Sequence, residues 1–176
     1  APYFTQTYST PWGPAINFDD EYSFGTRNYF IQNALMWFRD FHIDALRLDA
    51  VHAIKDYGAK HFMLELTEYT NELSSITGKS HYLIAESNLN DVRYINPVEK
   101  GGYQLDAQWS DDYHHAIHTK LTGDRFGYYM DYGNTQNIAK ALSDAFVYDE
   151  QYSTFRKKVY FFVSLLVLSN SCKKNP

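Results

Sequence analysis

Apolar side chains recur every three or four positions in two long segments of the chain, which predicts two helices with one buried face each. The first helix covers residues 26–41, and its apolar positions are Phe30, Ala34, Trp37, Phe38 and Phe41. The second covers residues 58–74, and Gly78 follows it as a residue that often ends a helix. Two further helices are predicted at residues 112–121 and 135–146.

Three shorter segments are rich in apolar residues and end in polar or acidic ones, which favours buried strands. They cover residues 43–49, 81–86 and 104–110. Turn-forming and aromatic residues predict a long ordered loop over residues 1–26, and Pro97 with two glycines predicts another over 96–103. Helices and strands therefore alternate, as they do in α/β proteins with a parallel sheet.

The ends of the predicted strands carry most of the candidate chemistry. Asp49, Glu86 and Asp111 follow three successive strands, and the active sites of β/α barrels lie at the carboxyl ends of their strands. An open parallel sheet binds ligands at the same edge. A glycine-rich phosphate-binding loop follows none of the strands, which argues against a nucleotide site.

The amino-acid composition indicates which kinds of binding partner are expected for the chain. The chain has 176 residues, 44% hydrophobic and 21% charged, which is typical of a folded domain, and its net charge of -5 without a basic block argues against nucleic acid. Aromatic residues make up 18% of the chain, and aromatic rings suit sugar surfaces. Cys172 is the single cysteine, so no internal disulfide forms, and we expect a reducing, cytoplasmic location. The apolar run 159–168 is shorter than the ~20 residues that span a bilayer, so no membrane partner is expected.

Arg47 and Asp49 share one face of the strand 43–49, because alternate residues of a strand point the same way. Either a structural ion pair or a functional pair would explain why these two residues lie on the same face. Glu86 ends the next strand after one helical crossover, so its carboxyl group is expected near that of Asp49. Two carboxyl groups in one cleft suit glycoside hydrolysis, with one as nucleophile and the other as acid and base.

The surroundings of the two carboxyl groups differ. Arg47 would keep Asp49 ionised, whereas Glu86 lies on an apolar strand that would let it hold a proton to donate. A structural carboxylate network and a metal site are the competing interpretations. His114 and His118 are spaced for a metal, but a third ligand is not evident, so neither a metal nor a cofactor is predicted. Trp12, Trp109 and Tyr113 are candidate sugar platforms.

Several motifs together resemble the α-amylase superfamily, glycoside hydrolase family 13, and within it the hydrolases that release trehalose. The segments 44–49 and 83–86 resemble the nucleophile and acid/base strands of that family. Four flanking segments narrow the match, namely residues 10–18, 49–54, 85–91 and 105–115. The resemblance covers about residues 3–158, which we expect to form one partial catalytic domain, with a non-matching end over 159–176.

The resemblance implies a partial (β/α)8 TIM barrel of three to four strands, incomplete at both ends. It implies retaining hydrolysis of the α-1,4 bond next to the trehalose unit of a maltooligosaccharide-type substrate. Asp49 matches the nucleophile, Glu86 the acid/base and Arg47 the arginine that pairs with the nucleophile. The residues expected to line the cleft are His52, Trp109, Asp112, His115 and Trp12.

The sequence also departs from the family pattern. The Asn-His-Asp segment that carries the family's third carboxylate does not occur in the 176 residues, and an earlier Asn-His pair is also missing. The chain opens Ala-Pro-Tyr-Phe without an initiator methionine, so we expect a fragment. Because its catalytic set is incomplete, we expect this fragment to be inactive alone. A branching enzyme, an amylase, and a carbohydrate-binding fragment without turnover stay open as alternatives, and the sequence does not predict the oligomeric state.

Overall fold

The computed structural model describes residues 3–159, and these form two compact units. The first unit contains residues 3–87 with 93–109, and the second contains residues 88–92 with 110–159. Apart from Val159, the apolar run and polar tail that were predicted for residues 159–176 lie outside the described residues. No helix within residues 3–159 combines the length and the apolar character that a membrane crossing requires.

A three-stranded parallel sheet organises the first unit. Its strands are β3 (Ala45–Leu48), β4 (Tyr82–Ala85) and β5 (Ala107–Gln108), with β4 in the centre. Leu83 and Ala85 of the central strand are fully buried. The predicted α/β fold with parallel strands is thus confirmed, while residues 3–159 do not form a closed barrel.

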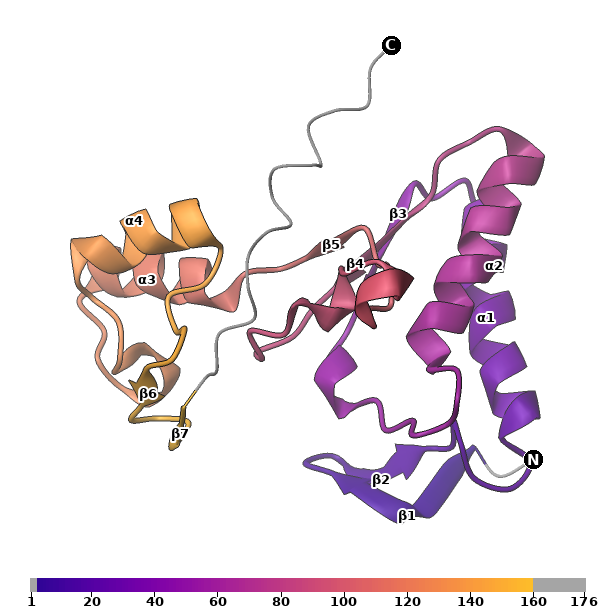
Figure 1. The fold of residues 1–176 in the computed structure, drawn as a ribbon, viewed down its shortest axis with the longest axis horizontal. Helices are drawn as coiled ribbons and strands as arrows, with labels where there is room; N and C mark the ends of the chain where they lie inside the picture. The colour runs from indigo at the N-terminus through magenta and orange to yellow at the C-terminus, as the bar shows by residue number, and fades with distance from the viewer. Residues whose placement is uncertain (1–2, 160–176) are drawn as a thin grey trace. The chain divides into compact units, whose positions relative to one another are not determined.

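Two helices lie side by side next to this sheet, α1 (Ser23–Arg39) and α2 (Phe62–Thr77) (Figure 1). Helix α1 buries one stripe of residues at helical spacing: Ile31, Ala34, Leu35 and Phe38. Helix α2 begins after His61, whose Nδ1 accepts a hydrogen bond from the Met63 N–H, and ends at Gly78, which has a left-handed φ of 67°. Both helices were predicted, with their ends displaced by two to four residues.

The structure differs from the loop that the sequence predicts over residues 1–26. Residues 4–16 form an antiparallel hairpin of β1 (Phe4–Thr10) and β2 (Gly13–Ile16), in which Thr10 pairs with Gly13. Threonine is frequent in strands, and it recurs along β1. Gly13 supplies the φ of 126° that the end of the turn requires. The abundance of turn formers concealed this pattern.

Short 3₁₀ helices connect the larger elements. They are η1 (Val51–Ala53), η2 (Val92–Tyr94), η3 (Val98–Lys100) and η4 (Gly127–Tyr129). The second unit consists of α3 (Asp111–Thr122), α4 (Thr135–Asp144) and a small hairpin of β6 (Tyr152–Ser153) with β7 (Lys158–Val159). Helices α3 and α4 lie side by side (Figure 1), and both were predicted to within two residues.

A buried carboxylate, Asp112, joins the parts of the second unit. Its Oδ2 accepts hydrogen bonds from Asn90 Nδ2 at 2.9 Å, the Val147 N–H at 2.7 Å and the Tyr148 N–H at 3.0 Å, and its Oδ1 accepts one from the Tyr132 hydroxyl. The side chain has no exposed surface. A buried carboxylate is tolerated only when it is well hydrogen-bonded, and here the bonds tie α3 to three other segments.

We expect Asp112→Ala to destabilise the second unit. The substitution leaves the buried N–H groups of Val147 and Tyr148 without their acceptor, at a cost of about 1–3 kcal/mol for each. Amide hydrogen exchange should therefore accelerate at these two residues, and the thermal midpoint should fall. Asp144→Ala, at the partly exposed end of α4, serves as the control and should change neither. Unchanged protection of both amides in Asp112→Ala would contradict the assignment.

Candidate active site

Three strand ends of the first unit meet at the guanidinium of Arg47. Its Nη1 lies 2.7 Å from Asp49 Oδ1, and its Nη2 lies 3.7 Å from Glu86 Oε2. The guanidinium also lies over the ring of Trp109, 4.5 Å from the ring centre. Asp49, Glu86 and Trp109 follow β3, β4 and β5 directly, so the parallel sheet brings together four of the predicted residues.

The strand register explains this convergence. Leu48 is paired with Ala85, and the ladder continues one step further because the Glu86 N–H donates to the Leu48 carbonyl at 2.9 Å. Asp49 and Glu86 therefore leave the sheet at the same level. The Trp109 N–H likewise donates to the Ala85 carbonyl at 2.9 Å, which fixes the third strand end.

The turn after Asp49 holds Glu86 in place. Ala50 has a left-handed φ of 45°, an uncommon conformation for a residue with a side chain, and its N–H donates to Glu86 Oε2 at 2.6 Å. The Val51 N–H donates to the Glu86 carbonyl at 3.0 Å. Backbone strain of this kind persists where the surroundings fix the geometry, and it gathers at functional sites.

The two carboxyl groups differ in exposure. The side chain of Asp49 is 79% exposed, whereas that of Glu86 is 18% exposed and receives a backbone N–H. Asp49 is therefore open to a ligand, and Glu86 is held mainly by protein groups. Such a pair can divide the roles of nucleophile and proton carrier.

A pocket of about 270 Å³ opens beside Asp49. One wall comes from the hairpin and the residues after it, and the other comes from the turn after β3; the lining residues are Phe4, Thr10, Trp12, Pro14, Ile16, Phe18, Asp49, Ala50, Ala53 and Ile54. Trp12 stands at the tip of the hairpin with 72% of its surface exposed. The pocket thus combines a predicted nucleophile with an open aromatic face, on which a sugar ring can stack.

His52 lies on η1, within the turn that forms one side of the pocket. The residue is half-buried, and among the described residues its Nδ1 is a buried ring nitrogen without a hydrogen-bond partner. Apart from Trp12, the pocket-lining residues of the hairpin escaped the sequence prediction because the hairpin itself did. The threonines of β1 were the available signal.

Asp112 and His115 lie in the second unit and are buried within it, so the structure does not support their expected place in an open cleft. Both oxygens of Asp112 are used inside that unit. His115 packs against the rings of Tyr128, Tyr129 and Tyr132, with centroids 5.3–5.5 Å away. We therefore leave both residues out of the proposed substrate site. Within residues 3–159, three or more His, Cys, Asp or Glu side chains do not gather in a way that would hold a metal ion.

Comparison with known proteins shows which enzymes have sequences similar to this chain. The chain is 48% identical over 159 residues to malto-oligosyltrehalose trehalohydrolase from Saccharolobus solfataricus, and 43% identical over 159 residues to the enzyme of that name from Rhizobium sp. (strain M-11). Each match covers 90% of this chain and 27% of the relative. The chain matches one segment of the malto-oligosyltrehalose trehalohydrolases. It spans about a quarter of the length of these relatives.

More distant proteins agree with this match. A glucan branching enzyme from Rhizobium radiobacter is 26% identical over 167 residues, which covers 78% of this chain and 22% of that protein. The crystal structure of a candidate α-amylase from Salmonella typhimurium superposes with a TM-score of 0.77 at 30% identity, covering 91% of this chain and 27% of that one. No protein-family model matches the chain. The α-amylase resemblance of the sequence is therefore confirmed in both sequence and fold.

We expect the stability of the second unit to depend on pH through His115. Burial lowers the pKa of His115 to about 4, helped by His114, Arg156 and His118 and opposed by Asp112, whereas an unfolded histidine titrates near 6.5. Between these values the unfolded chain binds more protons, so stability falls as the pH drops from about 6.5 towards 4. The loss is measured as the decrease in the urea midpoint of unfolding of the native chain between pH 7.5 and pH 5.

His115→Phe should lessen this acid sensitivity, because the ring remains but cannot take a proton. Leu121→Phe, at an exposed position of the same helix, is the control and should keep the native pH dependence. An equal acid sensitivity in His115→Phe and in the native chain would show that other groups cause it.

Proposed function

We propose that Arg47, Asp49 and Glu86 form part of the active site of a glycoside hydrolase. The reaction would cleave the α-1,4 bond next to the trehalose unit of a maltooligosyl trehalose and release trehalose. One observation carries the proposal: a single guanidinium contacts two carboxyl groups that come from adjacent strand ends. Similarity to proteins named malto-oligosyltrehalose trehalohydrolase supports the choice of substrate.

The mechanism follows from the two environments. Asp49, exposed and oriented by Arg47, attacks the anomeric carbon while Glu86 gives a proton to the departing glycosidic oxygen. Glu86 then takes a proton from the water that releases the sugar from Asp49. Retaining enzymes of this kind keep their two carboxyl groups about 5–5.5 Å apart, and contact with one guanidinium favours such a short separation.

The surrounding residues suit a sugar chain. Trp12 offers an aromatic face on the pocket beside Asp49, while the ring of Trp109 lies against the guanidinium of Arg47. His52 lies on η1, in the turn that follows Asp49. We propose that the three parallel strands belong to a (β/α)8 barrel, and that a third carboxylate is supplied by sequence outside these 176 residues.

Two other functions compete with this proposal. A branching enzyme or an amylase would use the same carboxyl groups with different surrounding loops, but the identity to the branching enzyme is 26% against 48% for the trehalohydrolase. The chain by itself can also serve as a carbohydrate-binding fragment without turnover. Measuring both binding and products separates these alternatives.

We expect a chimera to release trehalose when this chain replaces the matching segment of the Saccharolobus solfataricus enzyme. Maltooligosyl trehalose is the substrate, and chromatography of the products is the measurement. Release of glucose or shorter maltooligosaccharides without trehalose would favour an amylase, and new branch points in a glucan would favour a branching enzyme. A folded chimera that turns over none of these substrates would reject the proposal.

Variants of the chimera then assign the two roles. Asp49→Asn should abolish turnover of every substrate, because no covalent intermediate forms. Glu86→Gln should lower kcat/KM, which reports the first step, about 10²–10⁴-fold on the oligosaccharide, yet much less on an aryl α-glucoside whose leaving group needs no proton. Asp44→Asn, an exposed carboxylate just before β3, is the matched control and should retain full activity. Equal losses on both substrates in Glu86→Gln would overturn its role as proton carrier.

A further inference from the structure

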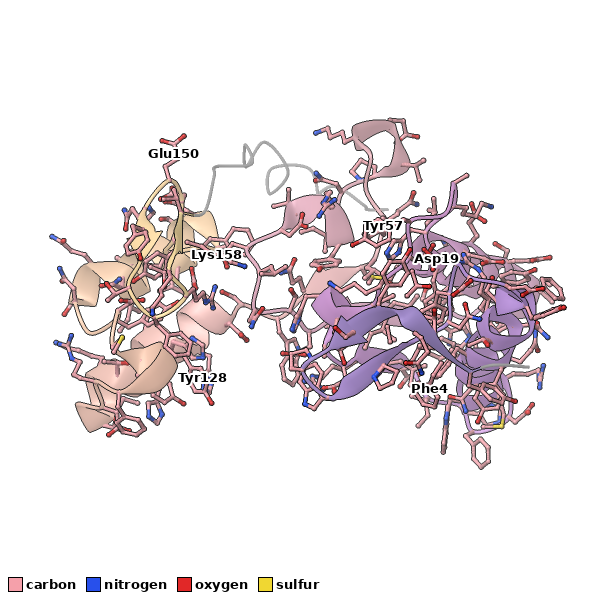
Figure 2. All side chains as sticks on the ribbon, turned by 90° about the horizontal axis from the view of Figure 1, so that it is seen from below. Phe4, Asp19, Tyr57, Tyr128, Glu150 and Lys158 are labelled. Carbon is pink, nitrogen blue, oxygen red and sulfur yellow. The ribbon has the colours of Figure 1, made fainter. Side chains whose placement is uncertain are left out.

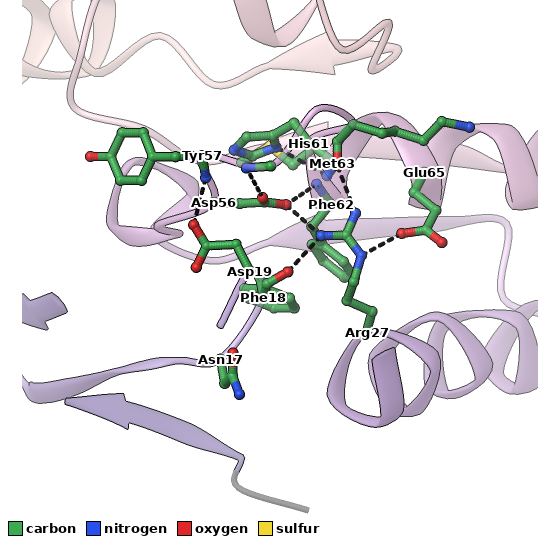
Figure 3. A network of polar contacts seen from close by, with 12 residues as sticks. Asn17, Phe18, Asp19, Arg27, Asp56, Tyr57, His61, Phe62, Met63 and Glu65 are labelled. Carbon is green, nitrogen blue, oxygen red and sulfur yellow. Dashed lines mark hydrogen bonds and ion pairs between the residues drawn. The ribbon is translucent and has the colours of Figure 1, made fainter. Parts of the chain in front are cut away.

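A second arginine, Arg27 on α1, forms a cluster of polar contacts outside the pocket (Figure 3). Its Nη1 donates to the Phe18 carbonyl at 2.7 Å and to Asp56 Oδ2 at 2.6 Å, and its Nη2 donates to the Lys60 carbonyl at 2.9 Å. Its Nε donates to Glu65 Oε2 at 2.6 Å. One planar side chain thus ties four separate points of the first unit together.

These contacts are well protected from water. The side chain of Arg27 is 13% exposed, and that of Asp56 is fully buried. Burial by itself would lower the pKa of Arg27, but hydrogen bonds to Asp56 and Glu65 outweigh it and raise the pKa, so the arginine stays charged. Asp56 also accepts hydrogen bonds from the N–H groups of Phe62 at 2.6 Å and Gly58 at 2.9 Å. The cluster is therefore a fixed point of the structure.

The cluster joins the bases of the two pocket walls. Phe18 lines the hairpin side of the pocket, and its carbonyl is held by Arg27. Ile54 lines the opposite side, and Asp56 follows it by two residues. Arg27 itself is not among the lining residues, so any effect it has on a ligand must act through the position of the walls.

A second contact strengthens this connection. Asp19 Oδ2 accepts hydrogen bonds from the Tyr57 N–H at 2.8 Å and from the Tyr8 hydroxyl at 3.2 Å. Asp19 and Tyr57 lie next to each other in Figure 2, one from each wall segment. The rings of Phe18 and Phe62 stack beside the cluster with their centres 4.1 Å apart. Charged, polar and aromatic contacts therefore all fix the hairpin against the turn after β3.

We propose that Arg27 is a positioning residue that sets the separation between the Trp12 wall and the Asp49 wall of the pocket. The inference rests on the proposed function, since it takes the pocket to bind an α-1,4-glucan chain. A guanidinium holds several acceptors in one plane, whereas a lysine ammonium has the same charge without that fixed geometry. Arg27→Lys should therefore loosen the walls without removing the charge.

The experiment measures binding of maltoheptaose to the full 176-residue chain by titration calorimetry. We expect Arg27→Lys to raise Kd on the order of tenfold, because a misplaced contact surface weakens binding even when no ligand contact is removed. Arg39→Lys is the matched control: Arg39 lies on the same helix, pairs with Asp40 at the exposed end and should leave Kd unchanged.

A double-mutant cycle with Trp12→Ala shows whether Arg27 acts through the pocket wall. If it does, Arg27→Lys should have little further effect on Kd once Trp12 is removed. A purely structural role for Arg27 predicts the opposite, namely equal effects with and without Trp12. That result, or an unchanged Kd in a folded Arg27→Lys chain, would overturn the inference.

Asp19→Ala keeps the test decisive if Arg27→Lys does not fold. This substitution removes the second connection between the walls. It should raise Kd when Trp12 is present and leave Kd unchanged when Trp12 is replaced by alanine. An unchanged Kd in the folded Asp19→Ala chain with Trp12 present would then reject the inference. A native chain that does not bind maltoheptaose would reject it as well. Failure of trehalose release in the chimera, with binding intact, rejects the proposed function and leaves the positioning role standing.

Discussion

Parallel pairing of β3 with β4 determines where the chemistry of the first unit lies. Leu48 is opposite Ala85, so the next residue of each strand is a carboxylic acid at the same edge of the sheet. Two negative groups placed so close together repel each other, and the Arg47 guanidinium between them offsets that repulsion. A shift of the register by one residue would turn one of the carboxyl groups to the other face and separate the pair.

The arginine has a geometric role as well as an electrostatic one. Its two terminal nitrogens reach separate carboxyl groups while its flat face covers Trp109, which a lysine could not reproduce. The backbone completes the arrangement, because the left-handed Ala50 directs its N–H at Glu86. Asp49 consequently remains the exposed member of the pair, and an exposed, oriented carboxylate is what a nucleophile requires.

Local sequence patterns predicted most of this site because its residues follow short apolar strands directly. Asp49, Glu86 and Arg47 could be placed from alternation and from the single crossover between two strands. The hairpin could not, because Pro11, Gly13 and Pro14 gave it the appearance of a loop, although residues three to twelve positions apart pair in it. Asp112 and His115 were expected in the cleft from the family resemblance alone, and their residue types do not show whether the side chains face a cleft or the interior. Their burial follows from contacts with Asn90 and with residues 128–148, which sequence spacing does not show.

Two arginines of the first unit, Arg47 and Arg27, have different roles in the proposed site. Arg47 stands at the open strand ends, where it contacts the groups that would react, and it is partly exposed. Arg27 stands behind the pocket and is nearly buried, and it contacts main-chain carbonyls and carboxylates that meet no ligand. Since the hairpin pairs with no strand of the central sheet, its position relative to Asp49 depends on side-chain contacts. Substitutions around Arg27 can therefore alter the shape of the pocket while the strand register preserves the arrangement of the two carboxyl groups.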